Sequence, residues 1–500
     1  MTQRPYYLLI VLLFVFSNTQ ALKRKSSRTS TPTLAELVTT HAKKASTGIK
    51  IVNLENSRTL YERLPTTHFI PASNTKICTA GAALHILGPS FRYETLFSTD
   101  TSVGVSRIGN LFIKGSGDPT LLYNDLKAMV LKVRAQGIRE IKGNIIIDSS
   151  IFDDQSAAPG WAPGDGPIFD KSELRGFLVD HSCLTVRIKP AHAVGRKPLV
   201  TIEPSTSFLK IDNRAITVSN PTKQAIHTFV THDNKILITG KIALKSGQKF
   251  YRIALRNPDL FAGHVVQELL RKHGIIHRGT VRKGIVPAKV RIVARHYSKP
   301  VHTIINTMMK KSDNLYADAL FKTVGARRYG AQGTWATGKK AVEDFLIKTM
   351  NLSERGFILN DGSGLSRTNR LSAAFLVDFL IAMYKKSPFK NHFINSLPIA
   401  GVDGSLRHRM GGSLTKGAVR AKTGSLAGVS SLSGYITLPS GEHLVFSLLT
   451  NKRKGQALSF KTTLEDRVCG VLLQRRGVKD YGQSVPNRAS HIIRPIHRKL

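Results

Sequence analysis

The stretch PASNTKICTAGAALHILG, residues 71–88, decides how the rest of this sequence is interpreted. It ends at Gly88-Pro89, a common signal for the end of a helix. We therefore expect a helix with Ser73 and Lys76 in its first turn. Side chains three residues apart lie on one face of a helix, so these two polar groups are expected to meet.

A serine and a lysine placed in this way can form a nucleophile and its base. The helix dipole favours developing negative charge at the N-terminus, and a lysine that has lost its proton can accept the serine proton. The spacing alone carries little weight, because an exposed serine cap and a solvated lysine give the same pattern. It also recurs elsewhere, at Ser207/Lys210, Ser246/Lys249, Ser387/Lys390 and Ser413/Lys416.

Two further motifs change this assessment. Residues 310–314 have the sequence KKSDN, in which Ser312-Asp313-Asn314 interrupts a helical pattern. Residues 421–424 have the sequence AKTG on an expected strand. Alone, the first motif is usually a helix cap and the second an edge of a sheet. Together with Ser73-x-x-Lys76, in this order and in these settings, they are the signature of active-serine penicillin-interacting enzymes.

The residue types predict a covalent mechanism. Ser73 is expected to attack a carbonyl carbon, with Lys76 as the base. Ser312 and Asn314 are expected beside it, passing a proton to the leaving group and orienting the substrate amide. Lys422 is expected to attract a substrate carboxylate and to keep Lys76 neutral by like-charge repulsion.

The oxyanion hole is expected to combine the backbone N–H of Ser73 with one on the strand after Gly424. Gly424 has no side chain, so substrate backbone can approach the strand closely. No Ser-His-Asp arrangement competes, because His85 lies further along the same helix and Gly362-Ser363-Gly364 lies in a loop. We expect no cofactor and no metal site.

The N-terminus predicts export. The apolar run from Tyr6 to Phe16 is too short to span a bilayer and is followed by small and polar residues. Residues 1–21 are therefore expected to be a signal peptide, with an uncleaved anchor as the alternative. Residues 22–33 are expected to be a flexible basic leader, and the protein is expected in the periplasm.

The rest of the 500-residue chain is too long for one ordinary core, so more than one domain is expected. Residues 34–90 and 300–473 predict one discontinuous catalytic domain, ending in an antiparallel meander of AVRAKTGSL, SSLSGYITL and HLVFSLLTN. Short strand-like runs and turns predict that residues 91–299 are a β-rich insert of two subdomains. The basic tail, residues 474–500, is expected to be disordered.

The charge of the chain predicts anionic partners. Lys and Arg number 74 against 32 Asp and Glu, a formal net charge of +42. For an exported protein, anionic envelope polymers are better candidates than nucleic acid, for which no motif is present. The three cysteines, Cys78, Cys183 and Cys469, neither form a disulfide framework nor have metal-ligand spacing.

With these motifs, the sequence resembles the D-alanyl-D-alanine carboxypeptidases/endopeptidases of the class C low-molecular-mass penicillin-binding proteins, over roughly residues 34–470. The long separation of Ser73 from Ser312 leaves room for an insert of that kind. The resemblance is carried by PASNTK (71–76), GSGDPTL (115–121), GNIIIDSSIFDD (143–154), APGW (158–161), MMKKSDNLYAD (308–318), NDGSGLSR (360–367), GVDGSL (401–406) and AKTGSLAGVSSLSGYI (421–436).

The resemblance implies an α+β fold, in which an antiparallel sheet flanked by helices forms a β-lactamase/transpeptidase-like domain with a β-rich insert. It implies a periplasmic serine peptidase that acts on peptidoglycan stem peptides and cross-links and is acylated by β-lactam antibiotics. Whether carboxypeptidase or endopeptidase cleavage dominates stays open. A β-lactamase would need a water-activating carboxylate, and no Glu lies in such a motif. A basic envelope-binding protein with vestigial activity is the remaining alternative.

The resemblance also implies substrate-binding residues. Ser425 offers the second oxyanion N–H, and Thr423 helps to bind the terminal carboxylate. Asp165 and Arg367 match positions that contact the amine and carboxylate of the diamino-acid side chain in relatives. GWAPGDG departs from the aromatic and acidic residues usual there, so a turn-stabilising role is the alternative for Asp165, as a structural ion pair is for Arg367. Asp361, like Asp313, is expected to fix a loop.

Overall fold

The structure, a computed structural model, describes residues 33–43, 45–101, 104–161, 172–219, 225–452 and 460–474. The expected signal peptide, all but the last residue of the basic leader, Asp165 and the tail after Gln474 lie outside these ranges, so those expectations stay predictions. Along the described ranges, no helix combines the length and the apolar character needed to cross a bilayer.

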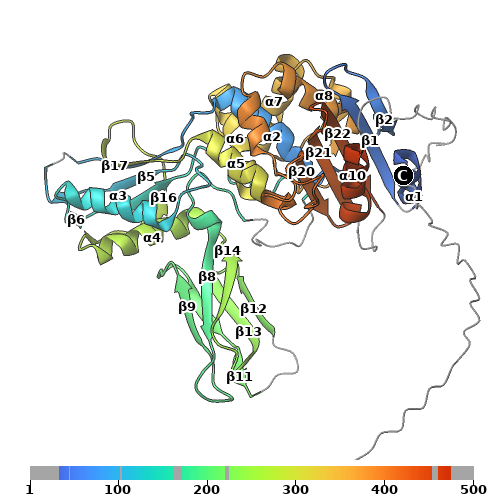
Figure 1. The fold of residues 1–500 in the computed structure, drawn as a ribbon. Coiled ribbons are helices and arrows are strands. Elements are labelled where there is room, and N and C mark those ends of the chain that lie inside the picture. Colours follow the sequence, from blue (N-terminus) through green and yellow to red (C-terminus); the bar gives the residue numbers. More distant parts are fainter. Residues whose placement is uncertain are drawn as a thin grey trace, which may run out of the picture.

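A five-stranded antiparallel sheet lies at the centre of one half of the molecule (Figure 1), in the order β2-β1-β22-β21-β20. The last three strands pair with their sequence neighbours, which confirms the predicted meander. The strand β1, from the other end of the chain, pairs with β22 along its whole length. The strands are β1 (Ser46–Asn53), β2 (Thr59–Arg63), β20 (Val419–Leu426), β21 (Val429–Thr437) and β22 (His443–Asn451).

Helices cover both faces of this sheet, because its strands are apolar on both sides. Adjacent residues such as Ile51 and Val52, or Phe446 and Val445, belong to two different core clusters. One face packs against α1 (Leu34–Ala42) and α10 (Asp466–Gln474). The other face shares its core with a group of helices: α2 (Thr75–Leu87), α5 (Val301–Lys311), α6 (Asn314–Tyr329), α7 (Trp335–Asp344), α8 (Ala373–Lys385) and α9 (Lys390–Ser396). A small hairpin of β18 (Phe357–Ile358) and β19 (Arg370–Leu371) belongs to the same core.

The predicted helix at residues 71–88 is present, but its start differs from the expectation. Ala72–Asn74 form a 3-10 turn, and the α-helix α2 begins only at Thr75. Ser73 therefore lies in the tight turn before the helix. Cys78 is fully buried in α2, and burial raises the pKa of its thiol to about 12.

The helices and strands from β3 (Glu94–Thr99) to β17 (Arg291–Tyr297) form the other half of the molecule, and the chain enters and leaves this half at one place (Figure 1). The strand β3 (Glu94–Thr99) pairs antiparallel with β17 (Arg291–Tyr297). Just outside this pair, the amide of Ser298 donates to Tyr93 O at 2.9 Å. The two connections therefore run side by side into the helical half.

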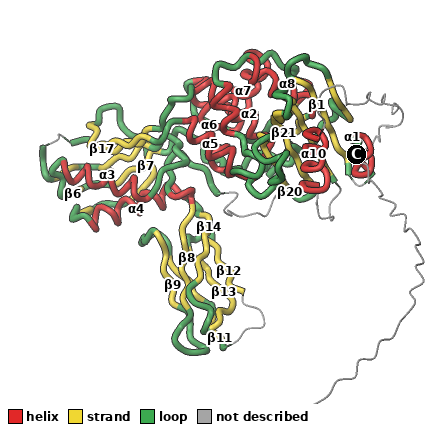
Figure 2. The backbone as a smooth tube through the Cα atoms, viewed as in Figure 1, coloured by secondary structure: helices red, strands yellow, loops and turns green. Residues whose placement is uncertain are grey.

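This second half has two parts, one with helices and one built of strands (Figure 2). In the first, α3 (Tyr123–Ala135) and α4 (Pro258–Lys272) pack on a mixed sheet of β16-β7-β5-β3-β17. This sheet contains β5 (Leu111–Lys114), β7 (Ile145–Asp148) and β16 (Val281–Lys283) in addition to β3 and β17. A separate sheet in the order β15-β6-β4 is formed by β4 (Arg107–Ile108), β6 (Glu140–Ile141) and β15 (Ile276–His277). The second part contains β8 (Cys183–Lys189), β9 (Leu199–Glu203), β10 (Lys210–Asn213), β11 (Ile216–Val218), β12 (Ala225–Val230), β13 (Lys235–Ala243) and β14 (Lys249–Ala254).

Truncation of Leu432 tests the packing of the central sheet. Leu432 is fully buried in β21 on the face that packs against α1 and α10. Leu432→Ala is expected to lower the free energy of unfolding by about 2–5 kcal/mol, because it removes buried methyl groups and leaves a cavity. Urea unfolding, followed by tryptophan fluorescence, measures the loss. The control is Leu199→Ala, the same change at a side chain that is 64% exposed, and an equally small loss at both positions would contradict this packing.

Candidate active site

The structure brings Ser73 and Lys76 together. Lys76 is fully buried, and its Nζ lies 2.9 Å from Ser73 Oγ. The same nitrogen lies 2.6 Å from Ser363 O and 2.7 Å from Asn314 Oδ1. Those two oxygens can only accept hydrogen bonds, whereas the Ser73 hydroxyl can also donate one. Both protonation states of the amine fit this set. An ammonium can donate to all three oxygens, whereas a neutral amine can donate to the two carbonyl oxygens and accept from the hydroxyl, as a base for Ser73 must.

Lys422 is a second buried lysine, close enough to Lys76 for their charges to interact. Its Nζ donates to Ser312 Oγ at 2.9 Å and to Thr423 O at 2.9 Å. Burial, together with the charge of Lys76, lowers the pKa of Lys422 well below its ordinary value. The repulsion is mutual, so the two amines favour a state in which only one of them carries a charge.

The break between α5 and α6 places Ser312 and Asn314, and it confirms the predicted interruption of the helical pattern. Ser312 ends α5 in the left-handed conformation, with φ 59°. Asp313 caps α6 by accepting a hydrogen bond from the amide of Tyr316 at 3.1 Å. The turn directs Ser312 toward one lysine and Asn314 toward the other.

Two glycines allow the backbone around Ser73 to pack closely. A Cβ on Gly424 would stand 2.1 Å from Ser431 Oγ and 3.0 Å from Ser73 N. Gly364 has φ +87°, and a Cβ there would stand 1.9 Å from Ala72 O. Strand β20 and the loop around Gly364 therefore both approach the backbone at Ser73, and neither can do so with a side chain at these positions.

The strand β20 is the edge of the sheet and presents backbone amides beside Ser73. The amide of Ala421 donates to Pro398 O, away from the neighbouring strand β21. Amide directions alternate along a strand, so the N–H groups of Thr423 and Ser425 point to this same edge. This places the N–H of Ser425 on the side where an oxyanion hole is expected.

Buried carboxylates hold the loop that carries Ser363. Asp361 accepts hydrogen bonds from Gly364 N at 2.8 Å and from Trp161 Nε1 at 2.9 Å. Asp318 accepts one from Ser363 N at 3.0 Å. Burial, and then the charge of Asp361, raises the pKa of Asp318 well above its ordinary value. The predicted loop-fixing role of Asp361 is confirmed by these contacts.

Arg367 lies on the same loop and reaches the end of β20. Its Nη2 donates a hydrogen bond to the backbone carbonyl oxygen of Ala427 at 3.1 Å. Asp165 lies outside the described residues. Trp161, which precedes it, is held against the site by its hydrogen bond to Asp361.

Sequence reasoning missed two contributors to the site. Ser363 acts through its backbone carbonyl, and the Gly-Ser-Gly turn around it was the available signal. Ser405 Oγ lies 2.7 Å from Thr423 Oγ1, and only its place in the GVDGSL segment marked it. His85 has a packing role, because its ring lies against Phe345 and Phe389.

Comparison with known proteins agrees with this geometry. Residues 31–466 match the family described as the D-Ala-D-Ala carboxypeptidase 3 (S13) family. The chain belongs to this family. It is therefore a hydrolase of the serine-type D-Ala-D-Ala carboxypeptidase class.

Relatives and solved structures cover most of the chain. It is 33% identical over 429 residues to the D-alanyl-D-alanine carboxypeptidase of Actinomadura sp. (strain R39), which covers 83% of this chain and 79% of the relative. It is 29% identical to the D-alanyl-D-alanine carboxypeptidase DacB of Haemophilus influenzae, covering 82% and 86%. The crystal structure of penicillin-binding protein 4 from Haemophilus influenzae is similar with a TM-score of 0.78 at 27% identity, covering 88% of this chain and 98% of that one. The predicted resemblance to DacB-like penicillin-binding proteins and the α+β fold class are confirmed.

A side chain at Gly424 tests the close approach of β20. Gly424→Ala is expected to slow acylation by a fluorescent penicillin about 10²-fold, the size of losing one oxyanion donor, because the new Cβ pushes β20 away from Ser73. The control is Gly470→Ala in α10, where an added Cβ meets nothing within 4 Å. Acylation at the wild-type rate in Gly424→Ala would show that the strand need not lie so close.

Proposed function

We propose that Ser73 is the nucleophile that cleaves the terminal D-Ala-D-Ala bond of peptidoglycan stem peptides. Its oxygen attacks the carbonyl carbon of the penultimate residue, its proton passes to Lys76, and the terminal D-alanine leaves with a proton on its amine. Water then hydrolyses the resulting ester and regenerates Ser73. The observation that carries this proposal is the 2.9 Å contact between the buried Lys76 Nζ and Ser73 Oγ.

The other catalytic groups divide the remaining tasks. We assign the proton transfer to the leaving amine to Ser312, whose hydroxyl contacts Lys422 Nζ. Asn314 accepts a hydrogen bond from Lys76 and orients the substrate amide with its other atoms. Lys422 attracts the substrate carboxylate and disfavours a second charge on Lys76.

Substrate binding is assigned to the edge of β20. The N–H groups of Ser73 and Ser425 hold the developing oxyanion, and Gly424 leaves room for the substrate backbone. Thr423 binds the terminal carboxylate with its hydroxyl, which Ser405 orients at 2.7 Å. Arg367, at the end of β20, is assigned to the carboxylate of the diamino-acid side chain, and Asp165 stays the proposed contact for its amine.

β-Lactam antibiotics and peptidoglycan are the proposed partners of this site. Penicillin-binding protein 4 from Haemophilus influenzae has been solved complexed with a β-lactam, and that structure is similar to this chain with a TM-score of 0.73 at 26% identity. A β-lactam ring offers a strained amide and a carboxylate, which match the proposed nucleophile and the carboxylate-binding lysine. We expect stable acylation of Ser73, because the nearby carboxylates of Asp318 and Asp361 are buried and accept hydrogen bonds from backbone amides of the loop around Ser363.

Location and charge complete the proposal. Residues 1–21 are assigned as a signal peptide that exports the protein to the periplasm. The net charge of +42 supports association with anionic envelope polymers, which keeps the enzyme near its substrate. Cleavage of cross-links as well as free stems is proposed, and mass analysis of muropeptides after digestion separates the two reactions. A protein that binds sacculi but releases no D-alanine would instead favour the vestigial alternative.

Removal of the Ser73 hydroxyl tests the nucleophile. Ser73→Ala is expected to abolish covalent labelling by a fluorescent penicillin and the release of D-alanine, because no oxygen remains to form the ester. Peptide mass spectrometry of the labelled wild type should place the adduct on Ser73. The control is Ser246→Ala, the serine of another Ser-x-x-Lys pattern, which should label normally. Equal labelling of Ser73→Ala would refute the proposal.

Replacement of Lys422 tests the pairing of the two lysines. Lys422→Met removes one of two like charges, so the remaining amine holds its proton to higher pH. The ascending limb of the acylation rate, measured from about pH 5 to about pH 10 at constant ionic strength, is expected to move to higher pH. Lys385→Met, at an exposed lysine, should leave the profile unchanged. An unshifted limb in Lys422→Met would show that the two charges do not interact.

A further inference from the structure

A left-handed turn of three non-glycine residues lies in the second half of the molecule. Asp180, His181 and Ser182 have φ of 50°, 65° and 53°. For L-residues this conformation costs roughly 1–2 kcal/mol at each position, so the surrounding structure must impose it. Strained backbone of this kind often lies near functional sites. In this turn it fixes the position of the His181 side chain.

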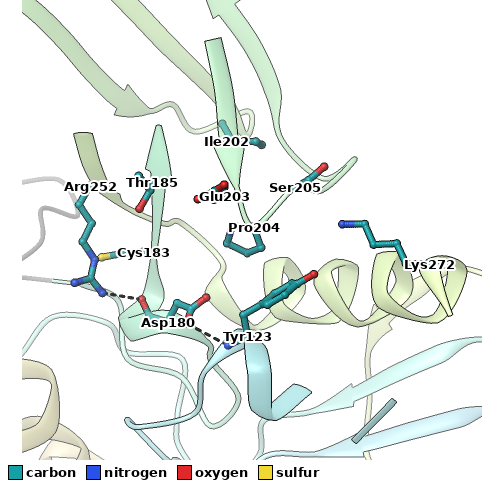
Figure 3. A pocket seen from close by; sticks show the side chains of 10 residues that line it. All are labelled: Tyr123, Asp180, Cys183, Thr185, Ile202, Glu203, Pro204, Ser205, Arg252 and Lys272. Carbon is teal, nitrogen blue, oxygen red and sulfur yellow. Dashed lines mark hydrogen bonds between the residues drawn. The ribbon is translucent and has the colours of Figure 1, made fainter. Parts of the chain in front are cut away.

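Hydrogen bonds from several elements hold the turn. Asp180 Oδ1 accepts from Tyr123 N at the start of α3, and Asp180 O accepts from Arg252 Nη2 on β14 (Figure 3). Ser182 Oγ donates to Glu173 O at 2.8 Å. Asp180 and Cys183 line one side of a cavity of about 680 Å³ (Figure 3). On the side that faces this cavity, the turn is therefore held by its hydrogen bonds and not by packing.

The residue at the middle of the turn contacts the catalytic half. His181 Nε2 lies 2.9 Å from both carboxylate oxygens of Asp313. The two side chains are only 12% and 15% exposed. Burial, the largest single effect, lowers the pKa of His181, but the hydrogen bonds to Asp313 and Cys183 and the charge of Asp313 together outweigh it and raise the pKa to about 9. At neutral pH the contact is therefore a largely buried ion pair between the His181 imidazolium of the insert and the Asp313 carboxylate of the loop between α5 and α6.

Asp313 joins two groups of the proposed mechanism. It stands between Ser312, which contacts Lys422 Nζ, and Asn314, which contacts Lys76 Nζ. It also caps α6 through the amide of Tyr316. A shift of the Asp313 carboxylate would therefore move both neighbours relative to the two lysines.

We propose that His181 is a positioning residue for the acyl-transfer reaction, by which the insert fixes Asp313 and through it the side chains of Ser312 and Asn314. It acts through its contact with Asp313. The inference rests on the proposed function of Ser73. It gives residues 91–299 a direct part in the rate of reaction, in addition to any part in substrate access.

The test compares His181→Asn, His181→Gln and Gln332→Ala. Asparagine tolerates the left-handed backbone but is too short to keep the contact. Glutamine is longer and keeps an N–H donor. Gln332 donates to Ser150 O at 3.1 Å and to Phe152 O at 3.0 Å, so its loss loosens the same boundary between the halves without touching Asp313.

The rate constant of acylation at saturating penicillin is expected to fall about tenfold in His181→Asn, with the dissociation constant unchanged within about twofold, because orientation and not binding is lost. His181→Gln should recover part of this loss, and Gln332→Ala should match the wild type. Introduced into Asp313→Asn, His181→Asn should cause no further loss, since both act through one contact. A wild-type rate in His181→Asn, an equal loss in Gln332→Ala, or full additivity with Asp313→Asn would each overturn the inference.

A second readout does not depend on the reaction. Hydrogen exchange followed by mass spectrometry should show faster exchange of the Tyr316 amide in His181→Asn than in the wild type or Gln332→Ala. Unchanged exchange would overturn the inference even if acylation slowed. Failure of the wild type to acylate at Ser73 would instead refute the proposed function, while the exchange measurement still decides whether His181 holds the catalytic loop.

Discussion

The burial of two lysines in one pocket is the constraint on which the rest of the site depends. Lys76 and Lys422 are both fully buried. An ammonium group removed from water costs several kcal/mol unless polar atoms surround it, and two of them also repel. Oxygen acceptors from separate segments offset this cost. Ser363 O and Asn314 Oδ1 accept hydrogen bonds from Lys76, and Ser312 Oγ accepts one from Lys422. In the proposed mechanism, the same arrangement favours loss of a proton from one lysine, which can then accept the proton of the Ser73 hydroxyl.

Several residues near the two lysines have a strained, left-handed backbone. Ala72, directly before the proposed nucleophile Ser73, and Ser312, in the loop between α5 and α6, are non-glycine residues with φ of 49° and 59°. His181, which contacts the next residue of that loop, has φ 65°. Each position is held by contacts from several elements, so the surrounding fold supplies the free energy that local backbone preference opposes. The surrounding contacts therefore fix the backbone at Ala72, Ser312 and His181.

The insert is joined to the catalytic half by more than its two connections. Lys322 of α6 is fully buried, and its Nζ lies 2.5 Å from Asp153 Oδ1 and 3.1 Å from Gln155 O. Trp335 Nε1 donates to Gln155 O as well. These contacts reach the back of α6, whose first residue is Asn314. Helix α6, which carries the proposed catalytic residue Asn314, is thus held at its start through Asp313 and further along through Lys322.

The sequence by itself determined the local parts of this protein. The break at Ser312-Asp313-Asn314, the three-strand meander and the pairing of Ser73 with Lys76 all follow from turn chemistry and periodicity within short segments. Only the tertiary structure decided that Ser363 would present a carbonyl to Lys76, and that His181 would meet Asp313. Those contacts join atoms far apart in the chain, one of them a backbone atom that every residue type carries. No local pattern encodes them, because they arise when separate segments bury their apolar faces against one another.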